Sequence, residues 1–521
     1  MADSVNADAR KRKRVSIEGS RDRKFRAVAI GIALVSSVLL VVASLRLSDG
    51  VDPNARVDAA VSSHPAVELP DNGQSTGKMV FAHYFPPYPL SIDNLPSGED
   101  YYATQYLNPN GERGSYAAFG GFLRDRPQPR PVSADPQWRQ RDLEDEVRQA
   151  IDAGISGFSV DILTKSSNPL WSSSVPSQLL AASAAVDPAF EIMLMPDMNG
   201  ELGTLDPANL AGELSQYASS PSVFRLTDNR VVISPFLAEK HDPAWWSQFL
   251  EIMKARYGIE VAFVPLFLNS TTNMDSFASI SYGMSTWGGR NPSFNPVTDT
   301  GIGSPLDQVN RAHALGKIWM QSVSFQDARP SQSVFDEAQN TGNLRNTWQI
   351  ARESDSEWVQ LISWNDYSEG TAFAPSEGHG RALLDLNAYF VDWFKTGTAP
   401  AIARDIAYVT YRNQLSSAQP ALPSVSPMIL RAGSSPVRDT IEVLTFLVEG
   451  AEVKVTVGGT TTTCSADTGM DICTVPSAVG AVSVSVVRNG AEVASAKAHS
   501  DVVSTPAVQN MEYLVDSSFG R

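Results

Sequence analysis

The sequence predicts an α/β fold, a (β/α)8 TIM barrel followed by a C-terminal β-sandwich domain. Eight short apolar runs alternate with helical stretches over about 320 residues, which is typical of a barrel. An open doubly wound sheet is the alternative, but it would need a glycine-rich loop after its first strand, where this chain has FPPYPLSIDN. After Pro400, period-two alternation with intervening turn residues predicts the sandwich.

The barrel elements follow one another in a regular order. The helix expected at 141–154 shows the pattern best, because Leu143, Val147 and Ala150 share one face and Gly154 ends it. The connection at 268–278 has the weakest helical pattern. Strands are expected at 78–84, 155–162, 190–196, 230–236, 260–266, 279–285, 317–323 and 358–364, and the other helices at 175–186, 207–219, 243–257, 305–315, 341–354 and 380–396.

The N-terminal region has the pattern of a membrane anchor. Residues 1–26 hold nine basic and four acidic residues, and the uncharged segment 27–45 follows. As a helix, at ~1.5 Å per residue, that segment spans ~28 Å, close to the hydrocarbon core of a bilayer. Positive flanks stay in the cytoplasm, so the remainder is expected outside the cell. The alternative is a cleaved signal peptide, with Val42-Ala43-Ser44 at the cleavage site, and a secreted protein.

These patterns divide the chain into five parts and constrain its partners. The formal net charge of −16 argues against nucleic-acid binding, which needs clustered basic residues. The histidines and cysteines show no zinc-ligand spacing, so we expect no metal. We also expect that the protein uses no cofactor and is a monomer. The expected parts are a cytoplasmic tail (1–26), a signal-anchor (27–45), a linker (46–77), the barrel (78–400) and the sandwich (401–521).

The two cysteines, Cys464 and Cys473, lie between β-rich runs and flank the segment SADTGMDI. An even number of cysteines close in sequence in an exported chain predicts a disulfide bond, and two free thiols are the alternative.

Candidate site residues lie where the predicted strands end, because a barrel forms its active site at the C-terminal ends of its strands. Acids, amides and large aromatics gather at these positions. Sugars are bound by this mixture, since aromatic faces cover the apolar ring surfaces while amides and acids bind the hydroxyls. The candidate substrate-binding residues are His83, Tyr84, Asp161, Asp197, Trp287, Gln321, Trp364, Asn365 and Tyr367.

Two carboxylates, Asp366 and Glu369, follow the last predicted strand in the sequence SWNDYSEG. Glycoside hydrolysis normally uses two carboxylates, one to protonate the leaving oxygen and one to activate water or attack the sugar. A spacing of three on a loop is compatible with ~5.5 Å or with the ~6.5–9.5 Å of inverting enzymes. A surface loop with incidental acids is the alternative, and the flanking Trp364 and Asn365 disfavour it.

SWNDYSEG resembles the Trp-Asn-Asp-Tyr-x-Glu motif of glycoside hydrolase family 71, the α-1,3-glucanases or mutanases. The segments VFAHYF, LMPDMNG and RLTDNRVVISPF are similar to the first, third and fourth strands of that family, and AIDAGISGFSVDI to its helix and second strand, over about residues 78–397. The resemblance implies an inverting hydrolysis of α-1,3-glucosidic bonds in a polysaccharide, with Glu369 as general acid and Asp366 as general base, although the roles could be exchanged.

EGTAFAP, at the end of the same stretch, is similar to the Glu-Gly-Thr segment of family 99, the endo-α-mannosidases and mannanases. An α-mannan-directed endo-hydrolase is therefore one alternative. A surface protein that binds polysaccharide without cleaving it is another, and the intact pair Asp366 and Glu369 argues against it.

Overall fold

The fold is seen in a computed structural model that describes residues 77–422 and 425–520. The predicted tail and signal-anchor, and the linker up to residue 76, lie outside these residues. Across the two described ranges, no helix has the length and apolar character needed to cross a membrane.

A parallel sheet of nine strands forms the barrel, in the order β5-β4-β3-β2-β1-β11-β8-β7-β6. The predicted fifth strand is divided into β5 and β6 at Val264-Pro265. Because β5 pairs with β4 and β6 pairs with β7, this divided strand closes the sheet, and the predicted barrel is confirmed. The strands are β1 (Met79–Tyr84), β2 (Gly157–Ile162), β3 (Glu191–Pro196), β4 (Val231–Ile233), β5 (Val261–Phe263), β6 (Leu266–Phe267), β7 (Gly283–Thr286), β8 (Ile318–Val323) and β11 (Trp358–Leu361).

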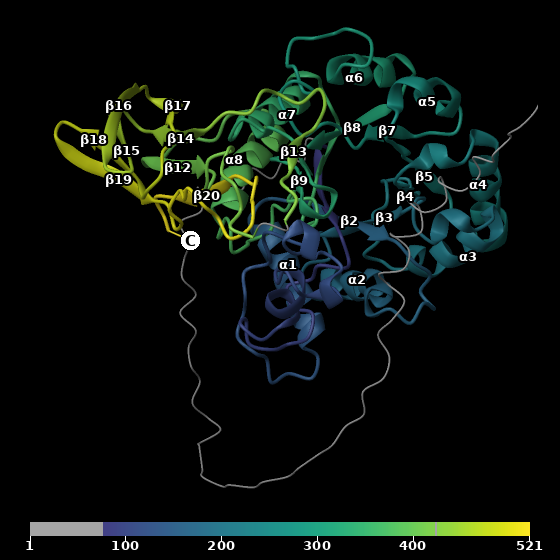
Figure 1. Cartoon of the computed structure of the whole chain (residues 1–521). Helices are drawn as coiled ribbons and strands as arrows, with labels where there is room; N and C mark the ends of the chain where they lie inside the picture. Colours follow the sequence, from purple (N-terminus) through teal and green to yellow (C-terminus); the bar gives the residue numbers. More distant parts are fainter. Residues whose placement is uncertain (1–76, 423–424, 521) are drawn as a thin grey trace, which may run out of the picture. The chain divides into compact units, whose positions relative to one another are not determined.

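Eight helices follow the barrel strands in turn and flank them (Figure 1). The connection with the weakest helical pattern is the short helix α5. Asp206, Asp242 and Ser304 accept backbone N–H bonds at the starts of α3, α4 and α6, and each precedes a proline, a pairing that favours helix initiation. The helices are α1 (Trp138–Asp152), α2 (Val175–Val186), α3 (Pro207–Ala218), α4 (Pro243–Tyr257), α5 (Ser270–Phe277), α6 (Pro305–Ala314), α7 (Gly342–Glu353) and α8 (Ala382–Thr396).

Side chains along each barrel strand alternate between two buried environments. On β1, Val80, Ala82 and Tyr84 join the large core beneath the helices. Phe81 joins the barrel interior instead, with Met193 and other side chains of the neighbouring strands. This alternation decides which strand-end residues can reach the barrel mouth.

The C-terminal part contains two antiparallel four-stranded sheets, with orders β17-β14-β12-β20 and β16-β15-β18-β19, as expected of a sandwich. The disulfide bond between Cys464 on β16 and Cys473 on β17 is confirmed, and it joins the two sheets. The strands are β12 (Ile406–Tyr411), β14 (Thr440–Leu447), β15 (Ala451–Val457), β16 (Thr460–Ala466), β17 (Gly469–Pro476), β18 (Val482–Arg488), β19 (Ala491–Lys497) and β20 (Leu514–Ser517).

A third, small sheet joins the C-terminal part to the barrel. Its strands β9 (Ala328–Arg329) and β10 (Val334–Phe335) lie between β8 and α7, whereas β13 (Ile429–Leu430) comes from the C-terminal part. β10 pairs with both, antiparallel to β9 and parallel to β13. Each of these strands has only two residues, which is too short for a recognisable alternation, so the sequence does not predict this sheet.

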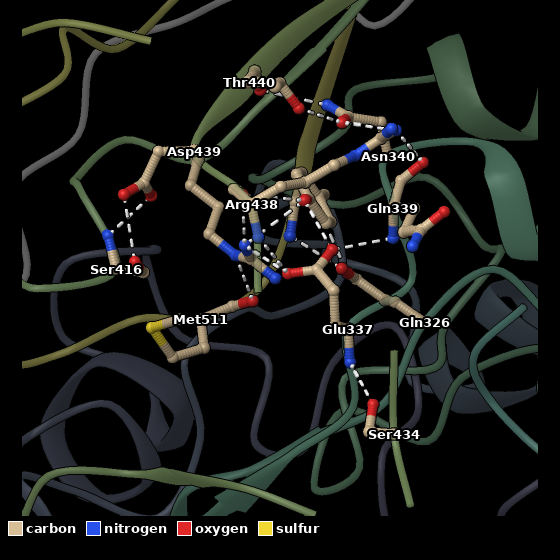
Figure 2. A network of polar contacts seen from close by, with 12 residues as sticks. Gln326, Glu337, Gln339, Asn340, Ser416, Ser434, Arg438, Asp439, Thr440 and Met511 are labelled. Carbon is tan, nitrogen blue, oxygen red and sulfur yellow. Dashed lines mark hydrogen bonds and ion pairs between the residues drawn. The ribbon is translucent and has the colours of Figure 1, made fainter. Parts of the chain in front are cut away.

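Polar side chains form a second junction around Glu337 (Figure 2). Arg412 donates to Glu337 at 2.9 Å, and the Tyr513 hydroxyl donates to the other oxygen at 2.7 Å. Arg438 donates to Asn340 at 3.1 Å. The barrel and the sandwich therefore share buried charged contacts.

Candidate active site

The mouth of the barrel gathers His83, Asp161 and Trp287 from three strand ends. His83 Nε2 lies 3.8 Å from Asp161 Oδ2, and the His83 ring meets Trp287 edge-on at 4.9 Å between ring centroids. Burial, helped by the charge of Arg290, lowers the pKa of His83 to about 3. Burial also raises the pKa of Asp161 well above its usual range. Because the His83 ring is neutral near pH 7, the two groups do not form an ion pair there.

Asp197 and Asp366 complete this acidic cluster. After burial, the largest causes of the raised pKa of Asp161 are the charges of Asp197 and Asp366. Asp197 directly follows β3, and its Oδ1 accepts the Asn199 backbone N–H at 2.6 Å. Burial raises the pKa of Asp197 also. The structure thus brings three predicted acids from separate strands to one place.

The loop after β11 turns around the Asp366 carboxylate. Asp366 Oδ1 accepts the Ser368 hydroxyl at 2.6 Å, the Ser368 backbone N–H at 3.0 Å and the Glu369 backbone N–H at 3.3 Å. The Asp366 backbone N–H is itself bonded to Ser363 Oγ at 2.7 Å. Burial raises the pKa of Asp366, against the opposing effects of Ser368 and Arg329. This turn fixes Asp366 and Glu369 on one short segment.

Glu369 makes a bidentate contact with Arg329. Arg329 Nη1 lies 2.7 Å from Oε1, and Nη2 donates to Oε2 at 2.9 Å. Burial raises the pKa of Glu369 to about 8, and Arg329 acts in the opposite direction while Asp366 and Asp327 add to the rise. A carboxyl with such a pKa can hold a proton at neutral pH, which a general acid requires.

Three predicted substrate-binding residues lie in the core and not at the mouth. The Tyr84 hydroxyl donates to Glu146 at 2.9 Å, and Trp364 Nε1 donates to the other Glu146 oxygen at 3.3 Å. Gln321 accepts the Trp319 indole N–H at 2.8 Å. We therefore remove Tyr84, Gln321 and Trp364 from the site. In β1 and β8, the neighbours His83 and Ser322 occupy the inward positions, as period-two alternation requires.

Asn365 and Tyr367 shape the loop and do not line the acidic cluster. Asn365 is fully buried and bonds to the backbone of Phe85 and Tyr88. Tyr367 packs with Tyr88 and Tyr102 in a separate aromatic cluster under the insertion that follows β1. Both residues therefore connect the loop after β11 to that insertion.

Sequence reasoning missed Arg329, Asp327 and Arg290. They lie in the connections after β7 and β8, beyond the strand ends, and no motif marks them. Arg290 is buried and donates from Nη1 to the Trp287 carbonyl at 2.6 Å. Across residues 77–422 and 425–520, no three His, Cys, Asp or Glu side chains are grouped so as to hold a metal ion.

In parallel barrels the active site lies at the C-terminal ends of the strands, which is where these buried carboxylates gather. The sequence matches the family model described as glycosyl hydrolase family 71 over residues 132–520. This chain belongs to glycosyl hydrolase family 71 and is a glycoside hydrolase.

Two relatives from Schizosaccharomyces pombe are similar to this chain. Glucan endo-1,3-alpha-glucosidase agn1 is 25% identical over 378 residues, covering 68% of this chain and 85% of the relative. The ascus wall endo-1,3-alpha-glucanase is 22% identical over 356 residues, covering 62% and 78%. Among solved structures, a GH99 endo-alpha-mannosidase from Bacteroides thetaiotaomicron has a TM-score of 0.47 at 17% identity, covering 61% of this chain and 97% of that one.

Proposed function

We propose that this protein hydrolyses the α-1,3-glucosidic bonds of a glucan, with Asp366 and Glu369 as its catalytic pair. The observation that carries the proposal is the loop after β11, where both carboxylates lie on one turn beside Asp161 and Arg329. The two relatives are a glucan endo-1,3-alpha-glucosidase and an endo-1,3-alpha-glucanase, which supports the choice of polymer.

In this proposal Glu369 is the general acid, because burial raises its pKa toward neutrality. Asp366 is the general base that orients the attacking water. Its Oδ1 is held by Ser368, so that its position does not depend on substrate. This assignment implies inversion, in which the water attacks the face opposite to the leaving oxygen.

The neighbouring side chains have the chemistry of a sugar subsite. Trp287 is half-buried against His83 and offers an aromatic surface, and Asp161 and Asp197 offer hydroxyl acceptors. His83 stays neutral at working pH, since burial lowers its pKa, and can therefore accept as well as donate hydrogen bonds.

We propose further that the enzyme works outside the cell, attached through segment 27–45. The Cys464–Cys473 disulfide supports this, because such bonds persist in oxidising compartments.

The test is reducing-sugar release by the wild-type protein from α-1,3-glucan, α-1,4-glucan and α-mannan. We expect release from α-1,3-glucan, and early proton NMR spectra should show the β-anomer as the first product. Release from α-mannan alone would replace the proposal with the mannan-directed alternative suggested by EGTAFAP. Binding to a polymer without any release would favour the non-catalytic alternative.

A further inference from the structure

The C-terminal part reaches the catalytic loop through a chain of charged contacts. Glu369 is paired with Arg329, and Arg329 Nε and Nη2 are in turn held by Asp327, with Nη2 to Oδ2 at 2.6 Å. Asp327 Oδ1 also accepts from Nη2 of Arg431 at 3.1 Å. Arg431 directly follows β13 and belongs to the C-terminal part.

Arg431 has a fixed position of its own. Its Nε donates to Asp336 at 2.6 Å, and its backbone N–H donates to the Phe335 carbonyl at 2.8 Å. Asp336 is held from the other side by Asn291 at 2.8 Å. A guanidinium that contacts two carboxylates and extends a sheet is well placed to hold Asp327 still.

The same small sheet also forms a hydrogen bond with the backbone of the loop that carries Glu369. The Ala328 N–H on β9 donates to the Glu369 carbonyl at 2.7 Å. Glu369 is thus fixed at its backbone by β9 and at its carboxyl by Arg329, the second residue of β9. A displacement of β9 would move both contacts together.

We propose that Arg431 is a positioning residue of the active site, acting through Asp327 and Arg329 to set the orientation and protonation of Glu369. This rests on the proposed function, in which Glu369 is the acid. It makes the C-terminal part a component of the catalytic centre and not an appended module.

The proposal predicts a shift in pH dependence with a definite sign. The charged groups that act on Glu369 are Arg329 and Arg290, which lower its pKa, and Asp366 and Asp327, which raise it. Loosening Arg329 therefore raises the pKa of Glu369. Because the acid must be protonated, the alkaline limb of the plot of kcat against pH moves to higher pH. The maximum kcat falls, because Glu369 is held less firmly.

The experiment compares Arg431→Met with Arg438→Met on α-1,3-glucan. Arg438 is a matched control, because its side chain is 31% exposed against 34% for Arg431 and it also bonds to the barrel, at Gln339 and Asn340 (Figure 2). None of the contacts described for Arg438 reaches the Arg329–Glu369 pair.

We expect Arg431→Met to lower kcat about tenfold with little change in KM, and to move the alkaline limb upward. Arg329→Met should show both effects more strongly. Arg438→Met should leave the limb in place. Arg431→Lys keeps the charge without the two-carboxylate contact, and should give an intermediate kcat and limb even if Arg431→Met does not fold.

Equal kcat losses in Arg431→Met and Arg438→Met, with no movement of the limb, would overturn the proposal. A Glu369→Gln variant measured alongside separates this failure from another. Full activity of Glu369→Gln would reject the catalytic pair itself, whereas an inactive Glu369→Gln with unshifted arginine variants would reject only the role of Arg431.

Discussion

Asn365 illustrates how one residue type serves two purposes. Its Oδ1 accepts the Phe85 N–H at 2.7 Å, and its Nδ2 donates to the carbonyls of Phe85 and Tyr88. An amide that follows a strand suits sugar hydroxyls and backbone groups equally well. The sequence predicts a substrate-binding role for Asn365, but residue type alone could not reveal that its partners here are backbone atoms.

Replacing Asn365 with Ala should destabilise the fold, because the Phe85 N–H and the Tyr88 carbonyl lose their hydrogen-bond partner, whereas the Phe85 carbonyl still accepts from the Tyr88 N–H. Each such group costs about 1–3 kcal/mol. We expect urea unfolding to show a loss of at least that size, while Asn209→Ala on the exposed face of α3 changes little. Equal unfolding midpoints for the two variants would show that the loop does not depend on Asn365.

At the scale of elements, the period-two alternation of the strands explains both what was predictable and what was not. Apolar runs, helix faces and capping residues are local, so strands and helices were found within a few residues. The direction of a strand's last side chain depends on register. An error of one residue therefore assigns a core side chain to the barrel mouth, or the reverse. On β1 this alternation places His83 at the mouth and Tyr84 in the core, although both end the strand.

Helix α1 carries a buried acid, Glu146, against Tyr84 and Trp364. Burial raises its pKa from 4.5 to about 8, against the opposing hydrogen bonds of those two residues. The folded protein therefore holds a proton that the unfolded chain releases above about pH 4.5. Its contribution to stability is complete below that pH and is lost as the pH rises through about 8.

Glu146→Gln cannot ionise and should weaken this pH dependence. We expect the urea midpoint of the wild-type protein to fall more between pH 5 and pH 8 than that of Glu146→Gln. Parallel curves for the two proteins would mean that Glu146 does not titrate in this window.

At the scale of the whole molecule, the junction of barrel and sandwich could not be read from the sequence. Its contacts join residues far apart in the chain, such as Glu337 with Arg412 and Asp327 with Arg431. Each is a single ion pair without periodicity. The predicted boundary at 400 and 401 separates two kinds of secondary structure, but Glu369 is linked through Arg329 and Asp327 to Arg431 on the other side of it.

The Glu337–Arg412 pair is almost fully buried, with side chains 0% and 3% exposed. Arg412→Met leaves a buried carboxylate without its cation, and we expect a loss of about 3–5 kcal/mol in the free energy of unfolding. Adding Glu337→Gln removes that charge and keeps an acceptor for Tyr513. The double variant should therefore be more stable than Arg412→Met, and a less stable double variant would contradict this account of the junction.

The central claim is that Asp366 and Glu369 perform the hydrolysis, and the most direct test is the rate of α-1,3-glucan cleavage by their neutral variants. Glu369→Gln and Asp366→Asn should each reduce cleavage by several orders of magnitude while the folded protein persists, and Glu251→Gln on the outer face of α4 should match the wild-type rate. Near wild-type cleavage by both Glu369→Gln and Asp366→Asn would contradict the claim and direct attention to Asp161 and Asp197.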